Sequence, residues 1–381
     1  MAPPADVVEI DPRAPDPAVL ARAGAVIRRG GLVAFPTETV YGLGANALDD
    51  AAVARIYAAK GRDAADPLIV HLASANDLSR VARTPSATAA AIARRFWPGP
   101  LTLVLERDPA VPARVSAGRA TVAVRVPDHA IARGLIEASG VPVAAPSANR
   151  FMRTSATTAA HVVADLGDAV DLILDGGPTA IGVESTVVAF DEDGAPRVLR
   201  PGAVPVEAIA EAMRAAGIDV GVRVGPASPG ATGGTFTDGA DPDRQVGEVS
   251  PGSMALHYAP RATLRLVAAG PGAVARMVAE ARAAIAAGRR VGVLLLAEDW
   301  PELVRVPGLE LAPLGAASDP PEVARRLFAA MRALDARGVA MIVARTLGPV
   351  GGGPVPVASA SGLSRAIDDR LVRAAGSQVL R

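Results

Sequence analysis

Apolar and polar positions alternate with two different periods along the first 220 residues. Apolar residues three and four apart predict helices at residues 16–29, 51–60, 86–96, 128–138, 157–166 and 205–216. Short apolar runs between them predict strands at residues 32–35, 67–72, 101–106, 120–126, 141–145, 171–174, 185–190 and 197–199. Because helices and strands are mixed along the chain, we expect an α/β layer fold with a twisted, mixed sheet.

The pattern changes after residue 220. Residues 221–262 are rich in Gly, Pro, Ser, Thr and Asp and have almost no periodicity, which is typical of a linker or a long functional loop. A regular strand–helix alternation follows at residues 263–268, 273–288, 290–296, 320–336, 339–343 and 361–375. It predicts a smaller C-terminal domain with a parallel, Rossmann-like sheet. We therefore expect one domain over residues 1–220, a linker over 221–262 and a second domain over 263–381.

Composition narrows the function classes. Half of the residues are hydrophobic, so a sizeable core is available, and 39 acids balance 39 bases. Without a basic excess, tight nucleic-acid binding by the whole chain is not indicated, although a local basic cleft remains open. The absence of cysteine excludes disulfides, thiolate metal sites and cysteine nucleophiles. No signal peptide and no apolar run of membrane-spanning length is present, so we expect a cytoplasmic protein without a membrane span.

A single lysine, Lys60, stands among 39 cationic residues. It lies at a predicted helix end next to Gly61 and Arg62, and His71 ends the strand that follows. A lysine and an arginine two apart form a natural clamp for phosphate, which they stabilise by fixed charge. The alternatives are that the single lysine is chance and that His71 is an ordinary structural hydrogen bonder.

Three further polar groups follow apolar strands. Residues 36–43 carry hydroxyls and a carboxylate, Arg125 ends a strand, and residues 144–150 and 154–155 offer hydroxyl and amide groups. Ligands of α/β folds bind at such strand ends. No Ser-His-Asp order, no H-E-x-x-H and no G-x-x-x-x-G-K-[ST] is evident. The residues thus indicate a site for a phosphorylated ligand and a small polar molecule, acting by positioning and charge stabilisation.

These motifs resemble the L-threonylcarbamoyladenylate synthase family (YrdC-like) in its long form with a C-terminal domain. The matching segments are FPTETVYGLGANA, AKGR, DPLIVH, FWPGPLTLVL, VAVRVPDH, PSANR, GVESTVV and VLRPG, with SPGSMALHYAP in the linker. The resemblance implies an N-terminal YrdC-like domain that makes threonylcarbamoyl-AMP and pyrophosphate from L-threonine, bicarbonate and ATP. The product serves N6-threonylcarbamoyladenosine formation in tRNA, next to the anticodon.

The resemblance also implies roles for individual residues. Lys60 and Arg62 would be catalytic, neutralising charge on the phosphates. The expected ATP contacts are Lys60, Arg62, Asp66, Thr121, Ser147, Asn149, Ser155 and Arg200. The expected L-threonine contacts are Thr39, His71, Arg125, Ala145 and Ser185. Mg²⁺ would accompany the nucleotide without a dedicated protein cage, so no protein metal site is expected. The implied partner is the downstream machinery that transfers threonylcarbamoyl to tRNA, and a weak contact with tRNA itself is an additional expectation. No membrane association is expected.

The chain departs from the family pattern beside the nucleotide motifs. Asp63 and Asp66 stand where the family usually has Pro and Asn, and a carboxylate at Asp66 can only accept hydrogen bonds and would repel phosphate. Met152 and Ala156 replace common Gly and Pro.

The linker residues His257 and Tyr258 lead us to expect a lid that excludes water from the labile carbamate. The alternative is that they anchor the linker to the C-terminal domain. Two other functions stay open, a YrdC-like carbamoyltransferase and a nucleotide- or RNA-binding module without turnover.

Overall fold

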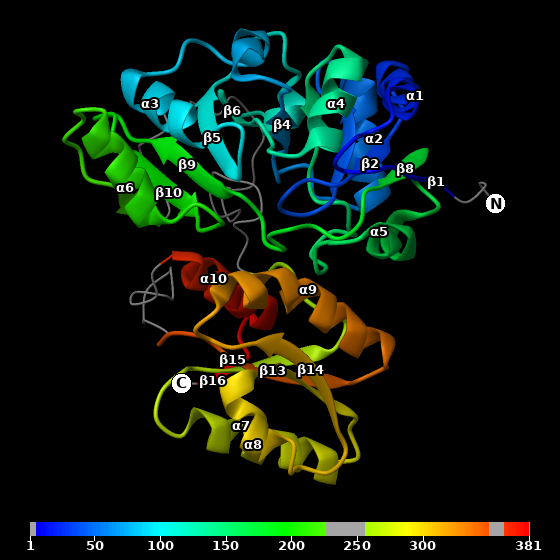
Figure 1. The fold of residues 1–381 in the computed structure, drawn as a ribbon, viewed down its shortest axis with the longest axis vertical. Helices are drawn as coiled ribbons and strands as arrows, with labels where there is room; N and C mark the ends of the chain where they lie inside the picture. The colour runs from blue at the N-terminus through cyan, green and yellow to red at the C-terminus, as the bar shows by residue number, and fades with distance from the viewer. Residues whose placement is uncertain (1–4, 226–255, 350–361, 381) are drawn as a thin grey trace, which may run out of the picture. The chain divides into compact units, whose positions relative to one another are not determined.

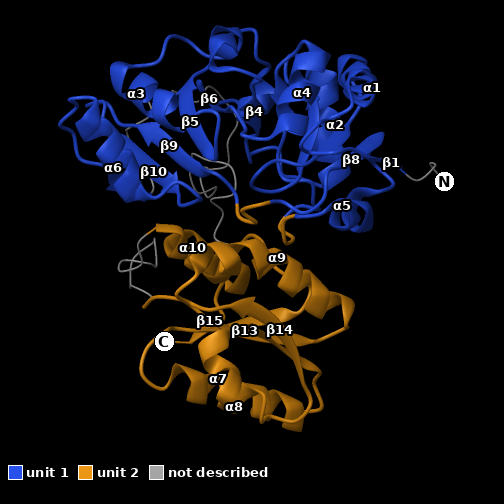
Figure 2. Ribbon diagram, viewed as in Figure 1, with its two compact units in different colours: residues 1–151, 156–179, 184–253 blue, residues 152–155, 180–183, 254–381 orange. Residues whose placement is uncertain are grey.

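The computed structural model describes residues 5–225, 256–349 and 362–380. The chain forms two compact units (Figure 2). Unit 1 comprises residues 1–151, 156–179 and 184–253, and unit 2 comprises residues 152–155, 180–183 and 254–381. Most of the predicted linker, residues 226–255, lies outside the described residues. Two short segments of the N-terminal half, 152–155 and 180–183, thus pack with the C-terminal unit.

Unit 1 contains one mixed sheet with the strand order β1-β8-β2-β3-β7-β4-β6-β5-β9-β10-β11. Its strands are β1 (Asp6–Glu9), β2 (Val33–Phe35), β3 (Gly42–Asn46), β4 (Ile69–His71), β5 (Leu101–Glu106), β6 (Thr121–Arg125), β7 (Val143–Ala144), β8 (Leu172–Asp175), β9 (Thr186–Phe190), β10 (Pro196–Arg200) and β11 (Arg223–Val224). Strands β4 and β6 are parallel, whereas β5 and β7 run antiparallel to these neighbours. The predicted α/β class with a mixed sheet is therefore confirmed.

Helices cover both faces of this sheet (Figure 1). They are α1 (Pro17–Arg28), α2 (Asp50–Lys60), α3 (Ala87–Phe96), α4 (Ala130–Ser139), α5 (Ala159–Leu166) and α6 (Val206–Ala215), with 3-10 helices η1 (Ala75–Arg80) and η2 (Ala113–Ser116). Buried residues of α1 and α4 share one core cluster, while those of α2, α3, α5 and α6 share the other. Adjacent residues of β2 divide accordingly, with Phe35 in the first cluster and Ala34 in the second. This alternation is what a strand buried on both faces requires.

Strand β3 was not predicted, because its sequence GLGAN lacks an apolar run. Close packing explains its glycines. A Cβ atom at Gly44 would lie 2.8 Å from the Phe35 ring and 2.9 Å from Val143 Cγ1. Only glycine lets the neighbouring side chains approach this strand so closely. Strand β3 turns the chain back along β2 and so holds the intervening residues 36–41 at the strand end.

Unit 2 contains a parallel sheet with the order β14-β13-β15-β12-β16. Its strands are β12 (Thr263–Val267), β13 (Val291–Leu296), β14 (Leu309–Gly315), β15 (Met341–Arg345) and β16 (Val379–Leu380). Its helices are α7 (Ala273–Ala286), the short 3-10 helix η3 (Ala297–Asp299), the short α8 (Trp300–Leu303), α9 (Pro320–Ala336) and α10 (Gly362–Ala375). Helices α7 and α8 lie on one face, and α9 and α10 lie on the other (Figure 1). The predicted parallel, Rossmann-like C-terminal sheet is confirmed.

Candidate active site

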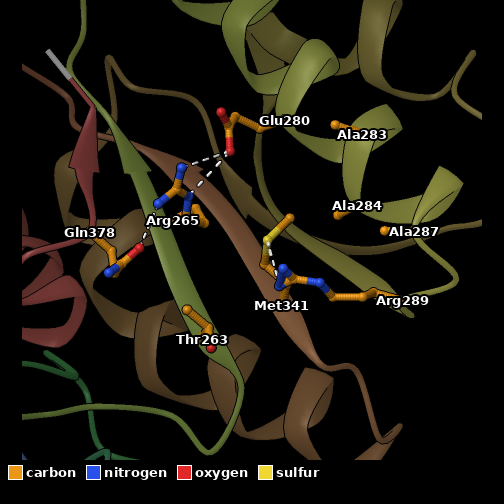
Figure 3. Close-up of a pocket in the computed structure, with 9 residues that line it drawn as sticks. All are labelled: Thr263, Arg265, Glu280, Ala283, Ala284, Ala287, Arg289, Met341 and Gln378. Atoms are coloured by element: carbon orange, nitrogen blue, oxygen red, sulfur yellow. Dashed lines mark hydrogen bonds and ion pairs between the residues drawn. The ribbon is translucent and has the colours of Figure 1, made fainter.

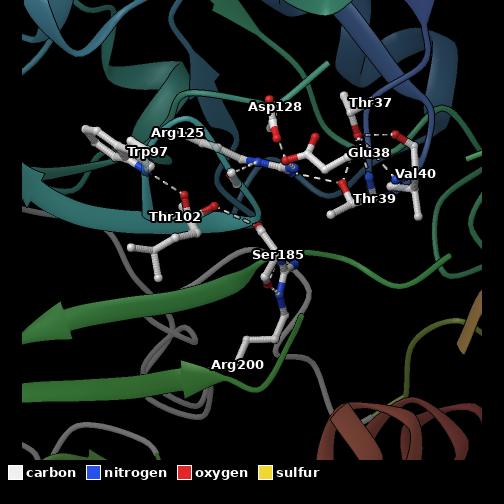
Figure 4. A network of polar contacts seen from close by, with 12 residues as sticks. Thr37, Glu38, Thr39, Val40, Trp97, Thr102, Arg125, Asp128, Ser185 and Arg200 are labelled. Atoms are coloured by element: carbon white, nitrogen blue, oxygen red, sulfur yellow. Dashed lines mark hydrogen bonds and ion pairs between the residues drawn. The ribbon is translucent and has the colours of Figure 1, made fainter. Parts of the chain in front are cut away.

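Arg125 is the buried cation of a polar cluster in unit 1 (Figure 4). It ends β6, and its guanidinium donates from Nη1 to Thr39 Oγ1 (2.9 Å) and from Nε to the Gly99 carbonyl oxygen (3.2 Å). Its Nη2 lies 2.6 Å from Glu38 Oε1 in an ion pair. A buried charge is costly unless it is paired and hydrogen-bonded. The turn after β2 therefore stabilises Arg125 by supplying the Glu38 carboxylate and the Thr39 hydroxyl.

The turn that carries these partners is held by its own hydroxyls. Thr37 Oγ1 donates to the Val40 carbonyl (2.7 Å) and accepts from the backbone N–H of Thr39 (3.1 Å). It also lies 2.8 Å from Thr39 Oγ1. Because the single Thr37 proton is used on Val40, the Thr39 hydroxyl donates to Thr37 and accepts from Arg125. Thr39 Oγ1 is thereby left with acceptor capacity directed away from these two bonds.

Glu38 is the carboxylate of this cluster and is 8% exposed. Its Oε1 accepts from the backbone N–H of Asp128 (3.1 Å) as well as pairing with Arg125. Its Oε2 is buried and has no hydrogen-bond partner among the described residues. A buried carboxylate oxygen without a donor is costly, so this atom is a candidate ligand contact.

A second group of polar side chains adjoins the first across β5. Thr102 of β5 pairs in register with Arg125 of β6, which places both side chains on one face of the sheet. Thr102 Oγ1 lies 2.7 Å from Ser185 Oγ. Arg200, at the end of β10, donates from Nη2 to the Ser185 carbonyl (3.0 Å) and to Ser185 Oγ (3.2 Å). The structure therefore brings the predicted Arg125, Ser185 and Arg200 into one region of the sheet.

His71 lies beside Arg125, because β4 and β6 pair in register at these two residues. The ring packs edge-on against Phe35 at 6.4 Å, and Nδ1 lies 3.3 Å from the Ile69 carbonyl. Burial, and then the positive charge of Arg125, lower the pKa of His71 to about 3. His71 is thus a neutral imidazole at physiological pH. With Nδ1 donating to Ile69, Nε2 is the acceptor of this tautomer.

Lys60, the last residue of α2, is buried. Its ammonium donates to the backbone carbonyls of Ser147 (2.6 Å) and Asn149, and its own carbonyl accepts from the Phe151 N–H (2.9 Å). Gly61 ends the helix in the left-handed conformation, with φ of 62°. The structure thus joins the predicted Lys60, Ser147 and Asn149, with the lysine fixing the loop that carries the other two.

Arg62 forms a buried ion pair with Asp66, with Nη2 2.8 Å from Oδ2. It also donates from Nε to the Asp66 carbonyl (3.1 Å) and from Nη2 to the Pro67 carbonyl (2.8 Å). The Tyr57 hydroxyl lies 3.1 Å from the Asp66 carbonyl, and burial raises the pKa of Tyr57 to about 12. Arg62 therefore fixes the loop after α2 through these bonds, and its guanidinium is already paired with the Asp66 carboxylate.

The other predicted residues lie as follows. Thr121 begins β6 on the same face as Arg125, about 13 Å along the strand by its four-residue separation. Ala145 follows β7, and its N–H donates to the Ile69 carbonyl (2.9 Å). Ser155 belongs to unit 2, where its carbonyl accepts from Arg332 Nε (3.2 Å).

The two expected lid residues also belong to unit 2 and are buried. The Tyr258 ring stacks on Phe328 with centroids 5.7 Å apart, and the Arg370 guanidinium lies 4.9 Å from the Tyr258 ring centroid. The backbone N–H of His257 donates to the Arg373 carbonyl (3.2 Å). These contacts fix both residues within the C-terminal unit.

Three polar residues of the site had no predicted role: Thr37, Glu38 and Thr102. Thr37 and Glu38 belong to a motif that was recognised only as a group. Thr102 interrupts the apolar strand LTLVL with a single hydroxyl, which is the signal that could have identified it.

Unit 2 has a cavity of its own. A cavity of about 390 Å³ in unit 2 lies between β12 and α7 (Figure 3), and Arg265, Glu280 and Gln378 form hydrogen bonds or an ion pair at its wall. None of the predicted site residues lines it. In the described ranges, no group of three or more His, Asp or Glu residues is placed to hold a metal ion. Among the same residues, no helix is both long and apolar enough to cross a membrane.

The fold and the site define a two-unit α/β protein with buried cations and hydroxyls gathered on a mixed sheet. Comparison with known proteins identifies its family. Residues 25–202 match a family described as "Telomere recombination" (Sua5, YciO and YrdC), and residues 204–376 match "Threonylcarbamoyl-AMP synthase, C-terminal domain". Threonylcarbamoyl-AMP synthase of Pyrococcus abyssi is 40% identical over 94% of each chain. The Bacillus subtilis protein of that name is 39% identical over 95% of this chain and 94% of its own.

A solved structure extends the likeness to the whole chain. The crystal structure of P. abyssi Sua5 complexed with L-threonine has a TM-score of 0.82, with 38% identity over 98% of each chain. This chain belongs to the threonylcarbamoyl-AMP synthase family, as its motifs predicted.

Proposed function

We propose that this chain makes threonylcarbamoyl-AMP and pyrophosphate from L-threonine, bicarbonate and ATP, for N6-threonylcarbamoyladenosine formation in tRNA. The observation that carries the proposal is the environment of Arg125. The side chain is a buried guanidinium at a strand end with Thr39, Glu38 and a backbone carbonyl on three of its sides. Such a preorganised, desolvated cation suits the carboxylate of a small amino acid.

At the amino-acid end of the site, Arg125 would hold the carboxylate of L-threonine. Thr39 and Ser185 would contribute hydroxyls, and His71, a neutral acceptor at Nε2, would accept from the substrate. Ala145 would contribute packing or backbone contact after β7.

At the nucleotide end, Lys60 and Arg62 would stabilise the charge that develops when a carbamate oxygen attacks the α-phosphorus and pyrophosphate leaves. Both cations already have partners, so phosphate must replace the Asp66 carboxylate on Arg62 or add to the carbonyls on Lys60. Ser147 and Asn149, held by Lys60, would contact the nucleotide together with Thr121 and Arg200. Ser155, on a segment of unit 2, is proposed as a further ATP contact.

Further parts of the proposal follow from the reaction. Mg²⁺ would bind to the triphosphate, which supplies oxygen ligands of its own. The product would pass to the machinery that transfers threonylcarbamoyl to tRNA, in the cytoplasm, with a weak tRNA contact as an additional element.

The role of His257 and Tyr258 has two candidate forms. As a lid, they would exclude water from the carbamate. As an anchor, they would fix the linker to unit 2, and the stacking of Tyr258 on Phe328 favours this form. Deletion of residues 221–381 separates the two, because unchanged yield and lifetime of the adenylate would refute the lid.

The function is tested by measuring pyrophosphate release from the full chain, with mass detection of threonylcarbamoyl-AMP. We expect release to require L-threonine, bicarbonate and ATP together. Carbamoyl phosphate used in place of bicarbonate and threonine would support the carbamoyltransferase. Nucleotide or RNA binding without pyrophosphate would support the binding module.

A further inference from the structure

We propose that Glu38 is a specificity-determining residue that accepts a hydrogen bond from the ammonium group of the amino-acid substrate through Oε2. The inference rests on the proposed function, because it concerns the amino-acid end of that site. It assigns a ligand contact to a carboxylate whose other contacts, to Arg125 and to the Asp128 N–H, use Oε1 alone.

The first argument is the unequal use of the two carboxylate oxygens. Oε1 has the Asp128 N–H at 3.1 Å and the Arg125 guanidinium at 2.6 Å. Oε2 is equally buried but has no hydrogen-bond donor among the described residues. A residue that only neutralised Arg125 could be turned to use both oxygens on the guanidinium fork, which is the geometry favoured by such pairs. The observed orientation instead leaves one oxygen for another donor.

The second argument is charge. Glu38 and Arg125 together are a neutral pair, and both are more than nine-tenths buried. A cation alone would favour any anion, including phosphate. A neutral pair of opposite charges is complementary to a zwitterion, whose carboxylate can meet the guanidinium while its ammonium meets the carboxylate. L-threonine is such a zwitterion, whereas bicarbonate and pyrophosphate are not.

The third argument is position. Glu38 and Thr39 are consecutive in the turn after β2, and both contact Arg125. A ligand carboxylate bound to the remaining N–H groups of Arg125 therefore lies beside the same turn that presents Oε2. The ammonium of an α-amino acid is only two bonds from its carboxylate carbon. One small ligand can therefore satisfy both charges at once.

The test is calorimetric binding of two probes to the full-length wild type and to Glu38→Gln. One probe is L-threonine, and the other is (R)-3-hydroxybutanoate, which keeps the carboxylate and hydroxyl but lacks the ammonium. For the wild type we expect L-threonine to bind at least about tenfold more tightly. For Glu38→Gln we expect L-threonine binding to weaken by about 10- to 100-fold, the usual range for a lost hydrogen bond between charged groups. Binding of 3-hydroxybutanoate should be unchanged or tighter.

The outcomes separate the possible roles. Equal weakening of both probes in Glu38→Gln would show that Glu38 only positions Arg125, and unchanged L-threonine binding would likewise overturn the inference. The wild-type comparison needs no variant, so equal binding of the two probes by the wild type would overturn it even if Glu38→Gln did not fold. If the wild type bound no L-threonine, the proposed function itself would fail. Glu106→Gln is the matched control, since Glu106 is an exposed residue paired with Arg83. This variant should bind both probes as the wild type does.

Discussion

Replacing Asp66 with Asn tests whether the carboxylate on Arg62 competes with ATP. The substitution keeps the volume and removes one negative charge from a buried ion pair, in which the side chains are 4% and 6% exposed. Arg62 would retain its two bonds to the carbonyls of Asp66 and Pro67, since those acceptors are backbone atoms. The guanidinium would therefore stay in place while losing its anionic partner.

The expected magnitude follows from the ion pair. Opposite charges about 4 Å apart attract by about 4 kcal/mol at an effective dielectric constant of about 20. ATP must overcome part of this attraction to use Arg62, so we expect Asp66→Asn to strengthen ATP binding by about 1–3 kcal/mol, or about 5- to 150-fold. The same substitution should lower the free energy of unfolding by about 3 kcal/mol. Loss of one member of a buried pair costs about 3–5 kcal/mol, and the remaining backbone bonds favour the lower end.

The assay is calorimetric ATP binding with the full chain, together with urea denaturation. Asp63→Asn is the control, because Asp63 lies in the same loop, is exposed, and accepts a hydrogen bond from the Ala65 N–H (2.9 Å). It should leave ATP affinity and stability near the wild-type values. If Asp66→Asn bound ATP no better than the wild type, or more weakly, Asp66 would be supporting Arg62 rather than competing with phosphate.

Three further outcomes are expected. Arg125→Lys keeps the charge but loses the guanidinium fork, so L-threonine binding measured by calorimetry should fall by about 100-fold while ATP binding is unchanged. Burial lowers the pKa of His71 from 6.5 to about 3, so the unfolded chain binds a proton that the folded chain does not. The contribution of His71 to the free energy of unfolding should therefore decrease by about 1.4 kcal/mol per pH unit as pH falls below about 6.5. Burial raises the pKa of Asp368 to about 7, which has the opposite effect in this range, so the measured quantity is the difference in slope between the wild type and His71→Gln from pH 7 to pH 5 in urea denaturation. Tyr258→Ala removes a ring stacked on Phe328 and should lower the stability of unit 2 by about 3–5 kcal/mol, seen as an earlier urea transition.

Much of the fold could be predicted because its elements depend on local patterns. Helices with apolar residues at three- and four-residue spacing were found with ends within a residue or two, as at α1 and α9. Strands β1, β3, β11, β14 and β16 were not predicted, and β3 and β14 show why. The first depends on Gly44 packing against Phe35, and the second contains Pro313, which an edge strand tolerates. In both cases the deciding interaction comes from a neighbouring element that the local sequence does not reveal.

Candidate residues of the site could be named from the sequence, but their partners could not. His71 and Arg125 meet because β4 and β6 pair in one particular register, and Thr102 faces Arg125 because β5 pairs on the other side. A shift of one residue in either pairing would turn these side chains to opposite faces. The pattern thus identified the cations, while the ion pairs of Arg62 and Arg125 needed the folded structure.

Those two ion pairs change the expected electrostatics of the site. The sequence predicted that Arg62 binds phosphate and that Arg125 binds a carboxylate. In the structure, however, Arg62 is paired with Asp66 and Arg125 is paired with Glu38. Each pair is neutral and buried, so neither creates the strong positive field that would attract every anion. A ligand must either displace the carboxylate, as we expect for phosphate at Arg62, or satisfy both charges, as an amino-acid zwitterion can at Arg125. The same arrangement of an arginine and a carboxylate therefore has opposite consequences at the two ends of the site, and Asp66→Asn and Glu38→Gln should accordingly change ligand affinity in opposite directions.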